Sequence, residues 1–141
     1  QANHFLDYAE PAADEMMVLD LEGLDTSQFM SLDDAELFAA HIKARTGRYP
    51  VLYTNHASAV LISKTYKNSV FAHTPLWYAR FKTQVTDFPK GLWPTYTLWQ
   101  FSSEIKPQKA IPGTRSDMDV NVFNGSVEQL RTAWPLTQRA P

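Results

Sequence analysis

Cysteine is absent from the 141 residues of this sequence, which excludes disulfide bonds and thiolate metal sites. No run of about 18 apolar residues is present, so no segment is expected to span a membrane. The formal net charge of -2 gives no electrostatic basis for binding nucleic acid. P-loop, dinucleotide-binding and G-x-S-x-G motifs are also missing. With 44% hydrophobic and 20% charged residues and no linker-like stretch, the chain is expected to form one globular domain over residues 1–141.

A short apolar run that ends in two carboxylates and a glycine, residues 16–23, stands out in this background. Read as a strand, it places Asp20 and Glu22 on one face, with Leu19 and Leu21 on the other. Two acids at this spacing lie roughly 6–7 Å apart, given a rise of about 3.3 Å per residue. Like charges held this close resist joint ionisation, which favours a functional use. The alternative is a solvated strand end followed by a turn at Gly23.

The hydrophobic pattern predicts an alternation of helices and strands that later gives way to bare strands. Strands are expected to begin near residues 16, 51, 75, 95 and 118. Helices are expected over 1–9, from Ser31 to about Gly47, over 57–66 and from Ser126 onward. Val60 and Leu61 are expected to face inward in the third of these helices, and Val127, Leu130 and Trp134 in the last. The last two gaps between strands hold mostly loop, as in an irregular barrel, although five strands alone do not close an eight-stranded one.

Five segments, in this order, resemble the glycoside hydrolase family 25 lysozymes. They are Val18-Leu19-Asp20-Leu21-Glu22, Tyr49-Pro50-Val51-Leu52-Tyr53-Thr54-Asn55, Pro75-Leu76-Trp77-Tyr78-Ala79-Arg80, Leu98-Trp99-Gln100-Phe101-Ser102-Ser103 and the stretch from Met118 to Gly125. The resemblance implies an α/β fold, an irregular TIM-like (β/α) barrel of which strands 4–8 are present. The first three strands, one of which carries a further active-site aspartate in the family, are missing from this sequence.

The resemblance also implies an activity: N-acetylmuramidase cleavage of the β-1,4 bond between N-acetylmuramic acid and N-acetylglucosamine in peptidoglycan. Glu22 matches the family's general acid, Asp20 its acidic neighbour on the same strand, and Asp119 a further acid on the last strand. Glycoside cleavage needs such a pair of carboxylates, and the predicted Asp20–Glu22 spacing lies between the ranges of retaining and inverting enzymes. Tyr53, Trp77 and Trp99 match groove-lining positions, and Gln100 follows Trp99 at a strand end, where a sugar-binding group is expected.

The implied partner is a peptidoglycan glycan strand, bound without a cofactor or metal by a secreted enzyme or a phage lysin. The segment that would complete the domain is a second expected partner, because a parallel sheet with open edges leaves backbone groups unpaired. Residues 1–141 are therefore predicted not to fold stably alone. Two other interpretations stay open, a non-catalytic glycan-binding remnant of the same fold and a purely structural fragment.

Other interpretations exist for several individual residues. Asp119 alternates with Asp117 and Asn121, as oxygen ligands of calcium do, but the glycine-centred turn and distal glutamate of a calcium loop are missing. The strand aromatics equally fit core packing, which is the expectation for Tyr78 and Phe101. The four histidines, His4, His41, His56 and His73, lack the spacing of metal ligands and are expected to be surface or structural residues.

Overall fold

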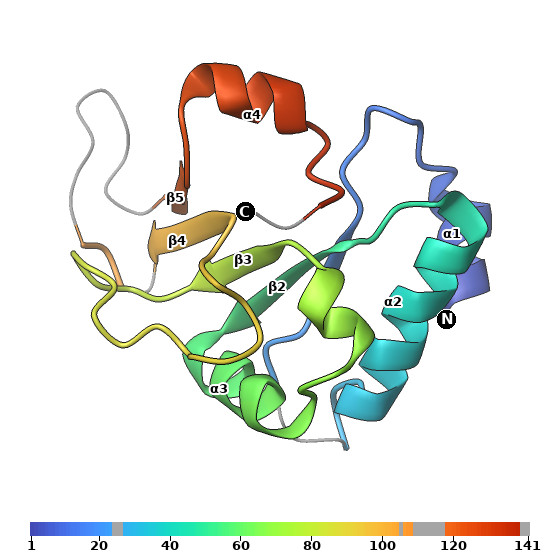
Figure 1. Cartoon of the computed structure of the whole chain (residues 1–141), viewed down its shortest axis with the longest axis horizontal. Helices are drawn as coiled ribbons and strands as arrows, with labels where there is room; N and C mark the ends of the chain where they lie inside the picture. Colours follow the sequence, from blue (N-terminus) through green and yellow to red (C-terminus); the bar gives the residue numbers. More distant parts are fainter. Residues whose placement is uncertain (24–26, 105, 109–117, 139–141) are drawn as a thin grey trace.

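The computed structural model describes residues 1–23, 27–104, 106–108 and 118–138 (Figure 1). Its elements are, in chain order, α1 (Ala2–Ala9), β1 (Val18–Asp20), α2 (Leu32–Thr46), β2 (Val51–Asn55), α3 (His56–Thr65), a short 3-10 helix η1 (Val70–His73), β3 (Leu76–Ala79), β4 (Leu98–Ser102), β5 (Val120–Phe123) and α4 (Val127–Ala133). Each predicted strand is present and begins within three residues of its predicted start. The predicted helices are present as well.

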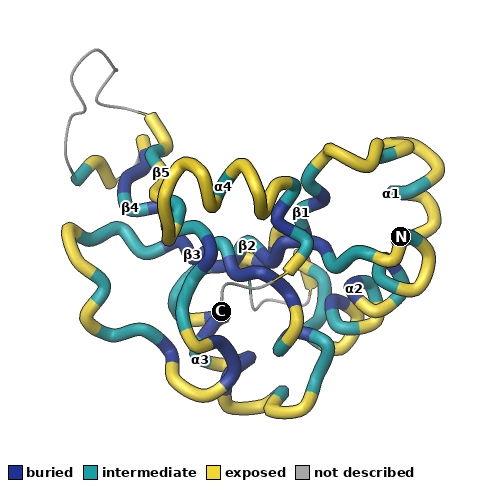
Figure 2. The backbone as a smooth tube through the Cα atoms, turned by 45° about the horizontal axis from the view of Figure 1, so that its top comes forward, coloured by how far each residue is buried: buried dark blue, intermediate teal, exposed yellow. Residues whose placement is uncertain are grey.

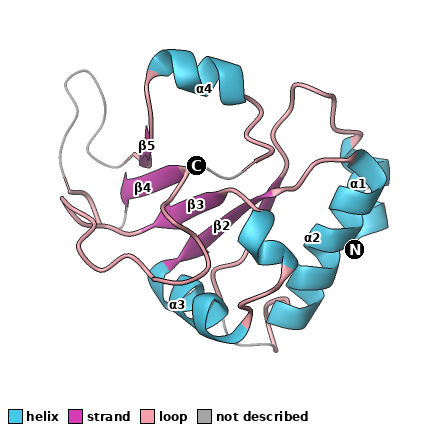
Figure 3. Cartoon of the chain, in the orientation of Figure 1, coloured by secondary structure: helices cyan, strands magenta, loops and turns pink. Residues whose placement is uncertain are grey.

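The five strands form one sheet in the order β1-β2-β3-β4-β5, with helices around it (Figure 3). Strands β1 to β4 are parallel, whereas β5 runs antiparallel to β4. The mixed α/β prediction is confirmed, but the expectation that all five strands are parallel is wrong for β5. Antiparallel neighbours need no helical crossover, which agrees with the loop-like sequence before β5. Within the described residues the sheet does not close, so a complete TIM-like barrel is not what this chain forms by itself.

Helix α2 follows its sequence signals closely. The Ser31 side chain accepts a hydrogen bond from the backbone N–H of Asp34, and the helix ends at Gly47 in the left-handed conformation, with φ 73°. Ala35 and Ala39 are fully buried and belong to the main hydrophobic core together with Leu19 and Leu52. The helix thereby covers the apolar face of the first strands.

Helix α4 begins where it was predicted to begin, but side chains expected to face the core are exposed. Ser126 and Gln129 form a complete capping box. The prediction that Val127 and Trp134 face inward is wrong, because their side chains are 59% and 49% exposed. The apolar anchor of this region is Leu136, just after the helix, which is 1% exposed. None of the residues of α4 is buried, so the apolar periodicity of this short helix does not indicate a buried face.

Helix α3 lies against β2 and β3 and buries Ala59 and Ile62 completely. The expectation that Leu61 faces inward is wrong, since it is 38% exposed, and Val60 is half-buried. The inward stripe is one position away from the predicted one, because the helix begins at His56 directly after β2.

Figure 2 shows buried segments concentrated in the central strands β2 and β3. The residues on the two faces of the sheet nevertheless differ in burial. Leu19 and Leu21 of the first strand region belong to the main hydrophobic core together with Tyr78. Neighbouring positions on the other face are more open: Asp20 is exposed and Tyr53 is half-buried. The alternation predicted for residues 19–22 is therefore confirmed, and the acids lie on the less buried face.

The amino ends of the parallel strands are covered by the last described residues of the chain. Trp134 Nε1 donates to the carbonyl of Asp14, just before β1, at 2.8 Å. Leu136 is buried near Thr97, which precedes β4, in the lining of one cavity. The carboxyl ends of β1 to β4 lie at the opposite end of the sheet, and there the acids are found.

Candidate active site

Asp20 ends β1, and Glu22 lies two residues further, where the neighbouring strand fixes its backbone. The N–H of Leu21 donates to the carbonyl of Tyr53 at 2.9 Å, and Thr54 Oγ1 donates to the carbonyl of Leu21 at 2.5 Å. Asn55 Nδ2 donates to the carbonyl of Glu22, while Asn55 Oδ1 caps α3. One asparagine thus connects the acid-bearing segment, the end of β2 and the start of α3, a role that its position in the sequence does not reveal.

The electrostatics distinguish Glu22 as the candidate proton donor. Burial raises the pKa of Glu22, and the negative charges of Asp20 and Asp119 raise this pKa further. Hydrogen bonding from Tyr53 works in the other direction and lowers the pKa of Glu22. Burial also raises the pKa of Asp20. The protonated form of Glu22 is thereby favoured up to a higher pH than in a solvated glutamate, as a general acid requires.

Tyr53 and Trp77 lie beside the acids in one row across the sheet. Asp20 is paired with Tyr53, and Tyr53 with Trp77, in the parallel register. The two rings meet edge to face with centroids 5.2 Å apart. The Tyr53 hydroxyl donates to Gln100 Oε1 at 2.6 Å, and Trp77 Nε1 donates to Asn121 Oδ1 at 2.7 Å. These bonds tie β2 to β4 and β3 to β5, and they hold both aromatic rings on the same face as the acids.

Asp119 directly precedes β5 and is exposed. Because β5 is antiparallel, its first residues lie at the edge where the parallel strands end. The effect of Asp119 on the pKa of Glu22 is consistent with this position. Asp117 lies outside the described residues, so the alternating oxygen ligands considered from the sequence are not described as a set. Over the residues whose structure is described, no group of three or more histidine, aspartate or glutamate side chains is arranged to hold a metal ion.

Trp99 lies on the opposite face of the sheet from the other predicted sugar-binding residues. It is paired with Tyr78, which is fully buried, and its Nε1 donates to the carbonyl of Arg80 at 2.7 Å. Its ring packs against Tyr96 and Phe101. The structure therefore brings Tyr53, Trp77 and Gln100 to the acids but does not bring Trp99 there. Tyr78 is a core residue, as expected.

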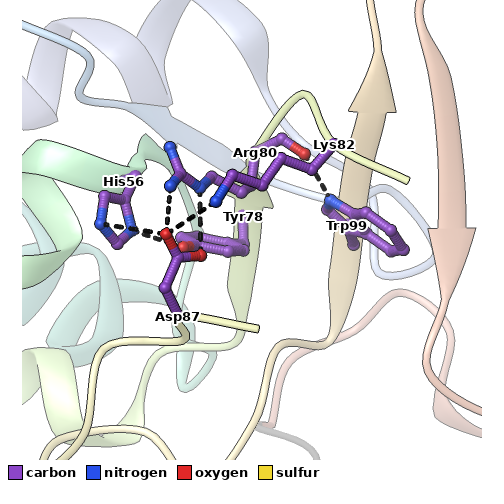
Figure 4. Close-up of polar contacts among 6 residues, drawn as sticks. All are labelled: His56, Tyr78, Arg80, Lys82, Asp87 and Trp99. Atoms are coloured by element: carbon purple, nitrogen blue, oxygen red, sulfur yellow. Dashed lines mark hydrogen bonds and ion pairs between the residues drawn. The ribbon is translucent and has the colours of Figure 1, made fainter. Parts of the chain in front are cut away.

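A second polar cluster, not expected from the sequence, lies at the end of β3 (Figure 4). The carboxylate of Asp87 forms ion pairs with Arg80 and with Lys82, the latter at 3.0 Å. His56 Nδ1 is 2.6 Å from the Tyr78 hydroxyl, and its Nε2 is 4.0 Å from Asp87. Burial lowers the pKa of His56, and Arg80 lowers it further. The cluster fastens the segment after β3 to the start of α3, and it gives His56 the structural role that was expected.

A small pocket opens directly beside the acids. It has a volume of about 280 Å³ and is lined by Asp20, Leu21, Glu22, Phe29 and Met30. Phe29 and Met30 come from the segment between β1 and α2 and were not among the predicted site residues. No periodicity marks them, because they precede the helix.

Carboxylates at the carboxyl ends of parallel strands, with aromatic rings on the same face, define the site of a carbohydrate-cleaving class of protein. Residues 1–109 match the sequence profile of Glycosyl hydrolases family 25. The chain belongs to this family, and the resemblance of its sequence segments is confirmed.

The chain is similar to several known proteins. It is 31% identical over 97 residues to an N,O-diacetylmuramidase of Arthroderma benhamiae, a match that covers 67% of this chain and 35% of that protein. Its fold is similar to the muramidase from Acremonium alcalophilum (TM-score 0.56, 24% identity, 94% of this chain and 64% of that one). It is also similar to the Clostridium perfringens spore cortex lytic enzyme SleM (TM-score 0.62, 23% identity, 91% and 45%) and to a family GH25 lysozyme from Aspergillus fumigatus (TM-score 0.55, 22% identity, 94% and 64%). The chain therefore spans about a third of the length of the curated relative that it matches.

Proposed function

We propose that this chain carries the catalytic carboxylates of a peptidoglycan muramidase, which hydrolyses the β-1,4 bond between N-acetylmuramic acid and N-acetylglucosamine. The observation that carries the proposal is the raised pKa of Glu22, beside Asp20 on the same face of the sheet. Family membership and the similarity to an N,O-diacetylmuramidase support the choice of substrate.

In this proposal Glu22 is the general acid that protonates the glycosidic oxygen as the bond to the leaving sugar breaks. A water molecule then adds to the anomeric carbon and returns a proton to Glu22. Asp20 and Asp119 are the groups that stabilise the positive charge developing on the sugar ring. Their negative charges also raise the pKa of Glu22, which favours the protonated form that a proton donor needs. Tyr53, Trp77 and Gln100 are the proposed sugar contacts. No cofactor enters the reaction.

Cell-wall turbidity tests the proposal. The full-length protein is expected to clear a suspension of bacterial walls, and Glu22→Gln is expected to lose about 10²–10⁴-fold in rate, the usual value of a placed proton donor. Glu128→Gln is the matched control, because Glu128 is exposed on α4, beyond the other end of the parallel strands. Equal clearing by the parent protein and Glu22→Gln would contradict the assignment. Binding to insoluble peptidoglycan without release of reducing ends would favour the glycan-binding alternative.

We further infer that the sheet is the C-terminal part of a family-type barrel, strands 4–8, and that its less buried face is covered by additional strands. The support is that Val18, Tyr53 and Leu98 on this face are only half-buried, whereas the opposite face is part of the core. Residues 1–141 alone are then expected to melt without a cooperative transition at low concentration. A sharp, reversible melting curve by circular dichroism would overturn this inference.

The site of action that fits a muramidase is the bacterial cell wall, reached by secretion or from a phage. No helix in the described part of the chain is long and apolar enough to cross a membrane. A secretion assay that follows the protein in culture medium and in cell extract tests the location, and retention of all of the protein inside the producing cell would speak against secretion.

A further inference from the structure

We propose that Phe29 is an aromatic platform for the sugar ring that binds next to Glu22. The inference rests on the proposed function and deepens it, because it adds a substrate-contacting residue from outside the sheet. Phe29, just ahead of α2, would then form one wall of the sugar-binding site.

The first observation is the exposure of the Phe29 ring. Its side chain is 49% exposed, although it is one of the larger apolar groups of the chain. Its ring contacts no other aromatic ring among the described residues, unlike Tyr78 and Trp99, which pack against several rings. An apolar ring left open to solvent has a free face on which a ligand can pack.

The second observation is the location of this free ring. Phe29 lines the pocket of about 280 Å³ together with both acids, Asp20 and Glu22. Other exposed apolar side chains, such as Tyr8 on α1 and Leu37 on α2, are not part of this lining. The free aromatic face is therefore continuous with the carboxylates.

The third observation is the way in which the ring is held. A Cβ atom built on Gly23 would lie 2.1–2.4 Å from three ring atoms of Phe29, so the ring fills the space that a side chain at position 23 would need. Only glycine permits this close approach. The ring consequently rests on the backbone directly after Glu22, and a ligand that stacks on it is placed beside the acid.

The chemistry of the pocket identifies the occupant. Two carboxylates disfavour an anionic ligand, and a purely apolar ligand would leave them without hydrogen-bond partners. A pyranose ring fits both the carboxylates and the aromatic ring of this pocket. Its hydroxyl and acetamido groups donate to the carboxylates, while its C–H face lies against the negative face of the aromatic ring. The uncharged N-acetylglucosamine ring of the glycan strand is therefore the ligand assigned to this platform.

The test is a binding titration with a tetrasaccharide of alternating N-acetylglucosamine and N-acetylmuramic acid. It is followed by calorimetry in the full-length protein, in a Glu22→Gln background that keeps the ligand intact. Phe29→Ala is expected to weaken binding about tenfold, the change that corresponds to 1.4 kcal/mol. Phe29→Trp is expected to bind within about twofold of the parent, because it restores an aromatic face. Tyr8→Ala, which removes an 86% exposed ring on α1, is the control and is expected to bind like the parent.

Phe29→Leu separates stacking from packing, because leucine still covers Gly23 but offers no aromatic face. Weak binding by Phe29→Leu supports the platform, and parent-like binding by this variant overturns it, also in the case that Phe29→Ala fails to fold. If the parent binds and Phe29→Ala binds equally well, the platform is refuted while the proposed function stands. If the parent does not bind the tetrasaccharide at all, the proposed function fails and the platform fails with it.

Discussion

Replacing Tyr53 by phenylalanine removes one hydroxyl group and leaves the ring that packs edge to face on Trp77. The hydroxyl donates to Gln100 Oε1 at 2.6 Å, and hydrogen bonding from the same group lowers the pKa of Glu22. A phenol has one proton, so the two acceptors compete for it, and an ionised carboxylate is the stronger acceptor. The variant therefore removes a bond that favours the ionised form of Glu22.

The direction and size of the effect follow from this contact. Loss of a bond to the carboxylate raises the pKa of Glu22 above its already raised value. A hydrogen bond to a charged group contributes about 1.5–3 kcal/mol, and the exposure of Glu22 reduces this to about a third. Gln100, which is 4% exposed, loses its hydrogen-bond donor, so the free energy of unfolding is expected to fall by about 1 kcal/mol.

The assay is an NMR titration of the Glu22 side chain in the parent and in Tyr53→Phe, with melting curves for both proteins. A pH–rate profile adds a second measurement, because the alkaline limb reports deprotonation of the general acid and is expected to move to higher pH. Tyr49→Phe is the matched control, since Tyr49 is also half-buried but packs against His73, before β2. An unchanged or lowered pKa of Glu22 in Tyr53→Phe, or an equal shift in Tyr49→Phe, would refute the reasoning.

Three further predictions concern other parts of the chain. Asp119→Asn is expected to lose less turnover than Glu22→Gln in the same wall-clearing assay, because charge stabilisation is shared with Asp20 while proton donation is not; the reverse order would reverse the assignment. Leu136→Ala is expected to lower the free energy of unfolding by about 2–4 kcal/mol in denaturant titrations, because the side chain is 1% exposed, and a loss below about 0.5 kcal/mol would show that the end of the chain is not an anchor. Arg80 and Lys82 hold the pKa of Asp87 well below its usual range, so the contribution of Asp87 to folding is present above about pH 4 and is lost as the pH falls towards the lowered pKa. Asp87→Asn is accordingly expected to exchange its amide hydrogens faster than the parent in the segment after β3 at pH 7. At the lowest pH at which the protein folds, variant and parent are expected to exchange at nearly the same rate. An equal ratio of variant to parent exchange rates at both pH values would contradict this.

Local patterns were enough to predict the position of the acids. In residues 19–22 apolar and acidic residues alternate, and the period of two places the acids on one face. The caps of α2 and α4 at Ser31 and Ser126 are equally local, because each is a contact between residues three apart. These features depend only on neighbours in the chain, so the sequence determines them.

The inner and outer faces of β3 and β4 were decided by the tertiary structure. β3 is apolar or aromatic at every position and β4 has large apolar or aromatic residues on both faces, so the pattern does not show which face carries the site. Trp77 and Trp99 look equivalent in the sequence, yet the register places Trp77 beside Tyr53 on one face of the sheet and Trp99 beside Tyr78 on the other face. Only the pairing of neighbouring strands distinguishes the two tryptophans.

Contacts between distant segments are the second group that the sequence does not determine. Asn55 reaches the carbonyl of Glu22, 33 positions earlier, and Phe29 rests on Gly23 through a loop without periodicity. The direction of β5 and the exposure of Val127 depend on which neighbours the folded chain provides at its end. The sequence alone thus determines the family, the acids and most of the helices and strands. The contacts and the burial of each side chain are decided by the tertiary structure, because they exist only after the strands have come together.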